Sequence, residues 1–302
     1  MTIVTHVATE ESEAIEFSQS IKKILVAVDG SESADNALTL ATRIAEKCSA
    51  VIDLIHVSDS QMGQSIGTRA PSKSTFSDGS VLLERSKTLV AKGLKTKPIY
   101  SFSSPNSVGD EILSTAEAGE YDLLVLGSRG LGRARGFFLG SVSKKIVGES
   151  KCSVLVSKAK TNDINRVLLA YDGSEGSRKT LGVVADLAKK FNAVVNVVSA
   201  ISEPMISAEL NVRAAIERLD AEMSHYSNEA ASSLKELGVT SENAKVVGAR
   251  KISIAIAREA DQGKYDIVAL GNRGWGKTKS MLLGSIASSV LDTSKVSLLI
   301  VK

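Results

Sequence analysis

Two stretches of the chain carry the same arrangement of glycines. Residues 127–141 read GSRGLGRARGFFLGS, and residues 271–285 read GNRGWGKTKSMLLGS. Each has glycine at its first, fourth and fourteenth positions and serine at its fifteenth, although most residues between them differ. Glycine lets the backbone turn with positive φ or approach a ligand closely. A glycine and serine at the start of a helix also leave free N–H groups, which favour a phosphate.

A carboxylate is repeated in the same way. Residues 24–31 read ILVAVDGS, and residues 167–174 read VLLAYDGS. Asp29 and Asp172 each follow a short apolar run, which predicts a buried strand. Their carboxylates can accept hydrogen bonds from ribose hydroxyls or from an adenine amine. A crevice with a hydrogen-bond acceptor at one end and hydrogen-bond donors for phosphate at the other is typical of a nucleotide site.

The predicted site of each copy includes neighbours of these motifs. The first site comprises Ala27, Asp29, Gly127, Ser128, Arg129, Gly130, Gly140, Ser141, Val142 and Ser143. The second comprises Ala170, Asp172, Gly271, Asn272, Arg273, Gly274, Gly284, Ser285 and Ile286. Further basic residues of the two loops bias the crevices toward anions: Arg133, Arg135, Lys277 and Lys279. The alternatives are that the glycines serve only as turns, that Asp29 is only a turn residue, and that the basic residues form a solvated rim.

The repetition extends over the whole sequence. Residues 121–158 and 265–302 align without a gap and are identical at 15 of 38 positions. We therefore expect a tail at residues 1–20, a first domain at 21–160 and a second at 161–302. Agreement between the two copies favours binding over a plain turn, because the glycines and the serine persist while the residues between them change.

Strands and helices are expected to alternate within each copy. In the first copy the pattern predicts strands at residues 23–28, 50–57, 97–102, 122–126 and 153–157, and helices at 33–47, 81–94, 106–118 and 141–149. Residues 58–80 are polar and predict a loop. In the second copy strands are expected at 166–170, 193–199, 244–247, 266–270 and 296–301, with a longer second helix at 207–237. This alternation is typical of an α/β fold, a parallel sheet with helices on both faces. Ligands bind such a sheet where the strand order reverses, and order 3-2-1-4-5 would bring carboxylate and loop together there.

The motifs resemble those of the universal stress protein family. Its nucleotide signature, G-x2-G-x9-G followed by Ser or Thr, is matched at Gly127–Ser141 and at Gly271–Ser285. The VDGS of residues 28–31 is similar to the end of the family's first strand. The resemblance covers residues 21–302, as a tandem member. It implies two open five-stranded parallel sheets of order 3-2-1-4-5, Rossmann-like and similar to the adenine nucleotide α-hydrolases.

The resemblance also implies a ligand and a function. Motif-bearing members bind ATP or AMP, with Mg²⁺ accompanying ATP, and act in the stress response as nucleotide-dependent binding proteins. Carried over, Asp29 and Asp172 would meet the adenosine and the glycine loops would hold the phosphates. The second copy has Ala287 where the first has Ser143, so phosphate binding there is expected to be weaker. The family pairs through its last strand. We therefore expect the apolar segments CSVLVS and VSLLIV to form an intramolecular pseudo-dimer, and further contacts could build a homo-oligomer.

Other chemistries fit less well. The GNRGWGKT of residues 271–278 matches a P-loop, but Gly284 interrupts the helix that should follow directly. The histidines, His6, His56 and His225, have no metal-ligand spacing, and His56 is interpreted as a structural residue at a strand end. No catalytic set can be assembled, so at most slow ATP hydrolysis is expected. The remaining alternatives are an ATP-dependent enzyme of the nucleotide α-hydrolase group, whose SGGxDS loop is replaced by VDGSES, and a scaffold with empty sites.

Composition narrows the class of partner. The 302 residues are 43% hydrophobic and 24% charged, with a formal net charge of +3. Such a small charge gives no reason to expect nucleic acid or an anionic membrane as a partner. No apolar run approaches the roughly 20 residues of a membrane helix, and the first 20 residues lack the features of a secretory signal. We therefore expect a cytoplasmic protein.

Overall fold

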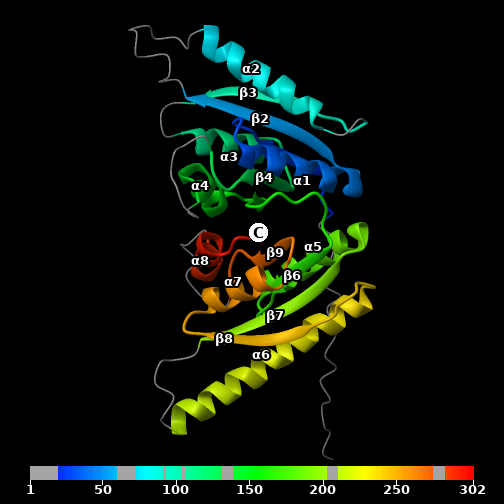
Figure 1. Cartoon of the computed structure of the whole chain (residues 1–302), viewed down its shortest axis with the longest axis vertical. Coiled ribbons are helices and arrows are strands. Elements are labelled where there is room, and N and C mark those ends of the chain that lie inside the picture. The colour runs from blue at the N-terminus through cyan, green and yellow to red at the C-terminus, as the bar shows by residue number, and fades with distance from the viewer. Residues whose placement is uncertain are drawn as a thin grey trace, which may run out of the picture.

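A computed structural model describes residues 20–59, 73–90, 93–103, 107–130, 139–202, 210–274 and 283–302. The first half contains β1 (Lys23–Ala27), α1 (Glu32–Cys48), β2 (Val51–Asp59), α2 (Lys73–Thr88), β3 (Pro98–Ser103), α3 (Val108–Ala118), β4 (Leu123–Gly127), α4 (Ser141–Glu149) and β5 (Ser153–Ser157). The second half repeats this order with β6 (Arg166–Ala170), α5 (Glu175–Phe191), β7 (Val194–Ser202), α6 (Leu210–Glu236), β8 (Ala244–Ala249), α7 (Ile252–Gln262), β9 (Ile267–Gly271), α8 (Ser285–Thr293) and β10 (Ser297–Val301) (Figure 1).

All ten strands belong to one sheet. Its order is β3-β2-β1-β4-β5-β10-β9-β6-β7-β8, so each half has the expected order 3-2-1-4-5. The expectation of two separate sheets is wrong, because β5 and β10 pair antiparallel, with Leu155 opposite Leu299. Every residue of these two strands is buried. Pairing them removes two apolar edges from water and satisfies their backbone groups at the same time.

Helices cover both faces of the sheet. Ile24 and Val26 of β1 point into an apolar layer shared with α1, α5 and α6. Leu25, between them, points into a second layer, which is shared with α3, α4, α7 and α8. This alternation is the period of two that a strand imposes on its side chains. A strand buried on both faces therefore needs a continuous apolar run, as the sequence has.

Short motifs fix the start of the long helices. Ser31 caps α1, which begins at Glu32 rather than at the predicted residue 33, and its side chain accepts a hydrogen bond from the Ala34 N–H at 3.2 Å. The preceding Gly30 has φ of 82°, a left-handed conformation that glycine adopts without strain. Ser174 caps α5 in the same way after Gly173, whose φ is 75°. The DGS sequence is thus the turn that leads each first strand into its helix.

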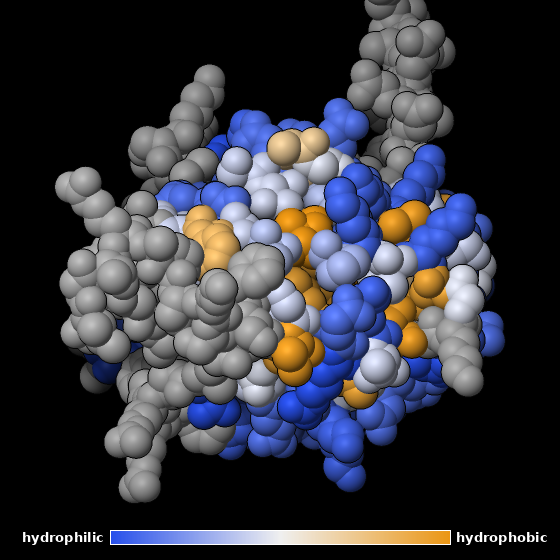
Figure 2. Space-filling model, turned by 90° about the horizontal axis from the view of Figure 1, so that it is seen from above, coloured by the Kyte–Doolittle hydropathy of each residue, from blue (hydrophilic) through white to orange (hydrophobic). Residues whose placement is uncertain are grey.

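Helix α2 begins inside the polar stretch that was expected to be a loop. It runs from Lys73, whereas the sequence predicted a start at residue 81. Gly79 explains part of the difference, since a Cβ there would lie 2.0 Å from the Tyr100 ring on β3. A small residue therefore lets the helix pack against the sheet, and this contact stabilises a segment with little helical periodicity. Seen from this end of the molecule, apolar residues lie among polar ones (Figure 2), and Val81 and Leu89 are exposed.

Candidate functional site

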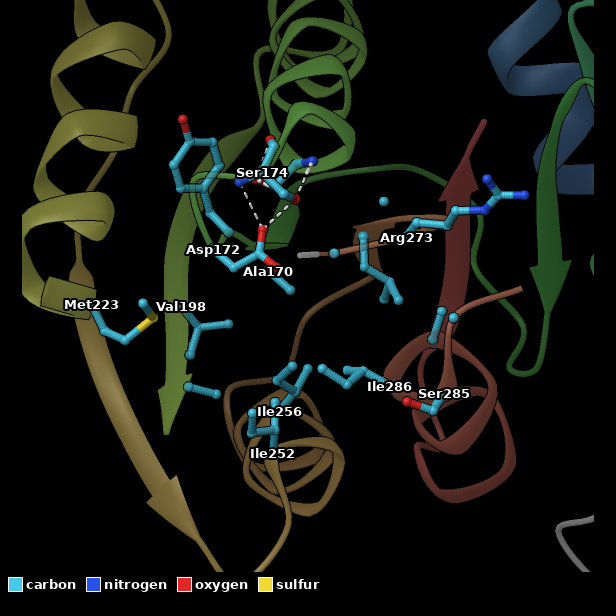
Figure 3. Close-up of a pocket in the computed structure, with 18 of the residues that line it drawn as sticks. Ala170, Asp172, Ser174, Val198, Met223, Ile252, Ile256, Arg273, Ser285 and Ile286 are labelled. Atoms are coloured by element: carbon cyan, nitrogen blue, oxygen red, sulfur yellow. Dashed lines mark hydrogen bonds between the residues drawn. The ribbon is translucent and has the colours of Figure 1, made fainter. Parts of the chain in front are cut away.

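A cavity lies at the carboxyl ends of the central strands in each half. The cavity of the first half, beside β1 and β4, has a volume of about 420 Å³. That of the second half, beside β6 and β9, has a volume of about 550 Å³ and is shown in Figure 3. β1 pairs directly with β4, and β6 pairs with β9, as binding at the point of strand reversal requires. Both volumes are typical of small-molecule sites.

The carboxylate and the glycine loop face each other in both cavities. The Ser31 N–H donates to Asp29 Oδ1 at 3.0 Å, and the Ser174 N–H donates to Asp172 Oδ1 at 3.1 Å. These short-range bonds hold each carboxylate at the end of its strand. The other oxygen, Oδ2, lies against the loop, since a Cβ at Gly130 would be 2.6 Å from Asp29 Oδ2. The second half repeats this approach, at the same distance, between Gly274 and Asp172.

The first two glycines of the motif serve close packing. Neither Gly127 nor Gly130 has positive φ, so a left-handed turn is not what requires glycine at these two positions. A Cβ at Gly127 would instead meet the Ser33 carbonyl carbon at 2.7 Å. In the second half, a Cβ at Gly271 would meet the Gly176 carbonyl carbon at the same distance. Glycine is needed there because the end of β4 or β9 touches the backbone of the first turn of the long helix.

The last glycine and the serine form the start of a helix, as predicted. Gly140 is the N-cap of α4, and its N–H donates to the Ser128 carbonyl at 2.9 Å. Gly284 caps α8 and donates to the Asn272 carbonyl at 2.8 Å. The N–H groups of the residues that follow each cap have no partner within the helix, because a helix begins its hydrogen bonds four residues later. Together with the positive end of the helix dipole, they favour an anion in the cavity.

Ser143 has a role that the sequence did not predict. Its hydroxyl is buried and donates to the Gly127 carbonyl at 2.9 Å. Its one hydroxyl hydrogen is used in this bond, so a contact between Ser143 and phosphate would require the hydroxyl to turn, and that contact stays a prediction. Ser143 ties the end of β4 to α4 instead. Ala287 takes its place in the second half and is buried without a hydroxyl.

Eighteen of the nineteen predicted site residues line the two cavities. The exception is Ser128, which is 7% exposed and has its Oγ 3.5 Å from Ser33 Oγ. Arg129 and Arg273 are among the lining residues, but the Arg273 side chain extends away from Asp172 (Figure 3). The other predicted basic residues, Arg133, Arg135, Lys277 and Lys279, lie outside the described residues. The Lys-Thr pair of the apparent P-loop lies there too, and the helix at the cavity begins at Ser285.

The sequence did not identify the apolar walls of the cavities. In the first half they are formed by Ile55, Val57, Val108 and Ile112. In the second half they are formed by Val198, Ala200, Ile252, Ile256, Leu219 and Met223. In the sequence these wall residues appear as alternate apolar positions at the ends of β2 and β7. On α3 and α7 they appear as apolar positions four residues apart at the start of each helix. Such positions are apolar whether they face a core or a ligand, so their pattern does not distinguish the two.

His56 is a structural residue, as predicted. Its Nδ1 lies 2.8 Å from the Val28 carbonyl, which only accepts, so this nitrogen carries the hydrogen. The other ring nitrogen lies 3.2 Å from Ser58 Oγ. In the second half the Ser199 hydroxyl donates to the Tyr171 carbonyl at 2.7 Å and replaces the imidazole bond. Both side chains hold the first strand to the second.

The part of the chain that the structure describes carries neither a metal cluster nor a membrane-spanning helix. In that part of the chain, no three His, Cys, Asp or Glu side chains are grouped so that they could hold a metal ion. None of the helices described there is long and apolar enough to cross a bilayer.

Comparison with known proteins relates both halves to one family. The profile of the Universal stress protein family matches residues 20–158 and again residues 163–302. Universal stress protein YxiE of Bacillus subtilis is 32% identical over 149 residues, which are 44% of this chain and 97% of that protein. A crystal structure of a universal stress protein from Archaeoglobus fulgidus has a TM-score of 0.68 at 22% identity, covering 93% of this chain and 96% of that one. With the family profile matched over most of its length, in two consecutive copies, this chain is a member of the universal stress protein family.

Proposed function

We propose that each half binds one adenine nucleotide, ATP or AMP, and that the bound nucleotide controls which partners the protein engages during stress. The observation that carries this proposal is the shared arrangement of the two cavities. In each, a carboxylate lies at the end of the first strand, and a helix with unpaired N–H groups begins at the other side.

The walls suit the parts of such a ligand. A carboxylate accepts several hydrogen bonds, so Asp29 and Asp172 can receive ribose hydroxyls in addition to the bonds from the DGS turn. Apolar side chains such as Ile55 and Val57 offer a surface for the base. The first N–H groups of α4 and α8, beginning at Ser141 and Ser285, offer donors to phosphate. Mg²⁺ accompanying ATP would be held mainly by the phosphates and water, as is usual for this ion.

Binding without efficient turnover fits the cavity residues better than catalysis does. Asp29 and Asp172 are the carboxylates among the described lining residues of the two cavities, and each lies against its glycine loop. Phosphoryl transfer needs a base or water-positioning group and a metal-binding carboxylate near the transferred phosphate. With one carboxylate placed at the adenosine end, we expect at most slow ATP hydrolysis.

The arrangement of the chain supports a second part of the proposal. We assign domains to residues 21–160 and 161–302, after a tail at residues 1–20, and regard the pair as an intramolecular pseudo-dimer. The antiparallel pairing of β5 with β10 supports this assignment, as does the match of a single-domain relative to 44% of the chain. We propose a cytoplasmic location, consistent with the absence of a membrane-spanning helix among the described elements.

A charge placed at each helix start tests the nucleotide sites. Ser141 and Ser285 are exposed and occupy the first helical position, where aspartate stabilises a helix. Aspartate would repel a phosphate, whereas asparagine adds no charge. Calorimetric titration with ATP and AMP should show two equivalents for the wild type, and S141D and S285D should each lose one. The neutral variants S141N and S285N should retain both. Binding that neither aspartate variant weakens, or no binding to the wild type, would contradict the proposal.

A further inference from the structure

A lysine follows the last strand of each half, and its side chain reaches the other half. Lys158 follows β5, and its Nζ donates to the carbonyls of Leu291 and Ser294 at the end of α8, at 2.6 Å for Ser294. Lys302 follows β10, and its Nζ donates to the Val147 carbonyl in the last turn of α4 at 2.7 Å. The crossing arises because β5 and β10 are antiparallel. A cation at a helix carboxyl end is favourable, so each lysine stabilises the anion-facing helix of the opposite half.

The two lysines differ in one contact. Lys302 Nζ also donates to Asn272 Oδ1 at 3.3 Å, and Asn272 lines the second cavity. The equivalent position in the first half is Ser128, a shorter residue whose Oγ faces Ser33. Lys302 therefore bonds to the glycine loop of its own half as well as to the opposite helix. Lys158 Nζ places both of its bonds on the end of α8.

Asn272 connects Lys302 to the start of α8. Its backbone N–H donates to the Val301 carbonyl of β10 at 2.8 Å. Its carbonyl accepts from the Gly284 N–H at 2.8 Å, which fixes the N-cap of α8. The residues that follow Gly284 carry the N–H groups directed at the cavity. A shift of Asn272 would therefore move the donors of the second site.

The environment of Lys302 affects the strength of its hydrogen bond to Asn272. Burial lowers the pKa of the Lys302 ammonium to about 8, with Cys152 opposing the shift and Arg273 adding to it. At neutral pH the group is mainly protonated and donates charge-assisted hydrogen bonds, which are stronger than neutral ones. Removing this partly buried charged donor also takes a hydrogen-bond partner from the Val147 carbonyl and from Asn272 Oδ1.

We propose that Lys302 is a positioning residue that sets the ligand affinity of the second site through Asn272 and ties that site to α4 of the first half. This inference rests on the proposed nucleotide function. It assigns to the second half a determinant that the first half lacks, since Ser128 replaces Asn272 there.

A matched pair of variants tests the proposal. In the S141D background, which leaves the second site as the binding site, K302M should weaken ATP or AMP binding about tenfold, the loss of one charge-assisted hydrogen bond. K158M removes a crossed lysine whose bonds lie at the carboxyl end of α8, away from the N–H groups at the cavity and without a contact to the loop, so it should change affinity less than about twofold. Equal losses of affinity in the two variants would overturn the positioning role. Such losses would arise from the contact between the two halves and not from the contact with Asn272.

A double-mutant cycle tests the route through Asn272. N272S copies the residue of the first half, and K302M should add less than about twofold to its effect on affinity. Additive losses would overturn the route through Asn272.

Hydrogen exchange separates this inference from the proposed function. In the protein without nucleotide, K302M should speed exchange of the Gly284 N–H about tenfold relative to K158M, because its acceptor Asn272 is less fixed. If no variant and no wild-type sample binds nucleotide, the proposed function fails, and with it the claim about affinity. Unchanged Gly284 exchange in K302M, with nucleotide binding intact, would overturn the positioning role alone.

Discussion

At the scale of single residues, one motif meets two different demands. Gly127 and Gly271 are glycines because a helix backbone lies where a Cβ would be. Gly140 caps a helix with φ of −63°, and a Cβ there would meet its nearest neighbour, the Ser128 carbonyl, at 3.7 Å. Glycine is thus needed for tight packing at one position of the motif and starts a helix at another.

This difference predicts the stability of two alanine variants. G127A should lower the free energy of unfolding by about 1–3 kcal/mol, because the added methyl group collides with the Ser33 backbone. G140A should change it by less than about 0.5 kcal/mol, since reduced freedom of the unfolded chain offsets the weaker cap. Denaturant titration of both variants measures the difference. Similar losses would show that packing against Ser33 is not the constraint.

At the scale of elements, the long helices depend on the turn that also holds the carboxylate. Ser31 caps α1 and, through its N–H, binds Asp29. A cap and a site residue are therefore fixed by one DGS sequence. The second half repeats the arrangement with Ser174 and Asp172.

The position of the cap can be tested directly. S31A should destabilise the protein by about 1 kcal/mol, because the Ala34 N–H loses its acceptor. S33A, two residues later, should cost less than about 0.5 kcal/mol, since Ser33 lies within the helix and its nearest hydrogen bond is long, 3.4 Å from the Arg129 N–H. Thermal unfolding measures the loss of stability in both variants. S33A would show the larger loss if Ser33 were the cap.

Much of this element scale could be predicted from the sequence, and the exceptions have physical causes. Helix α4 and strand β5 lie at the predicted residues, because glycine and short apolar runs mark their ends. Helix α2 starts earlier than expected, because packing of Gly79 on Tyr100 is a tertiary contact that no local pattern records. The site motifs were visible because the chain repeats them. The apolar walls were not, since a residue such as Ile112 reads as ordinary core.

At the scale of the whole molecule, the interface between the halves contains two partly buried cations, Lys158 and Lys302. Burial lowers the pKa of Lys158 and of Lys302 to about 8, from an ordinary value of 10.5. In the unfolded chain both lysines would hold their protons up to about pH 10. Between pH 8 and 10 the unfolded chain therefore binds more protons than the folded protein, and stability rises with pH in this window.

A pH series of unfolding measurements tests this sign. Each lysine contributes a slope of up to about 1.4 kcal/mol per pH unit, an upper bound because its carbonyl acceptors favour the charged form. The K158M/K302M double variant should show a smaller rise from pH 8 to 10 than the wild type. Taking the difference cancels the other titrating groups, such as Tyr121, whose pKa is raised by burial. Parallel curves would show that the two lysines keep ordinary pKa values.

The continuous sheet also has a consequence for how the two halves can change over time. Because β5 and β10 join within one polypeptide, dilution cannot separate the halves. In an assembly of identical single-domain chains, every substitution is copied into both pockets. Here a substitution in one half changes the residues of one pocket alone, and the two pockets already differ, with Asn272 and Ala287 in the second half where the first has Ser128 and Ser143. One molecule can thereby keep one pocket unchanged while the residues of the other pocket change.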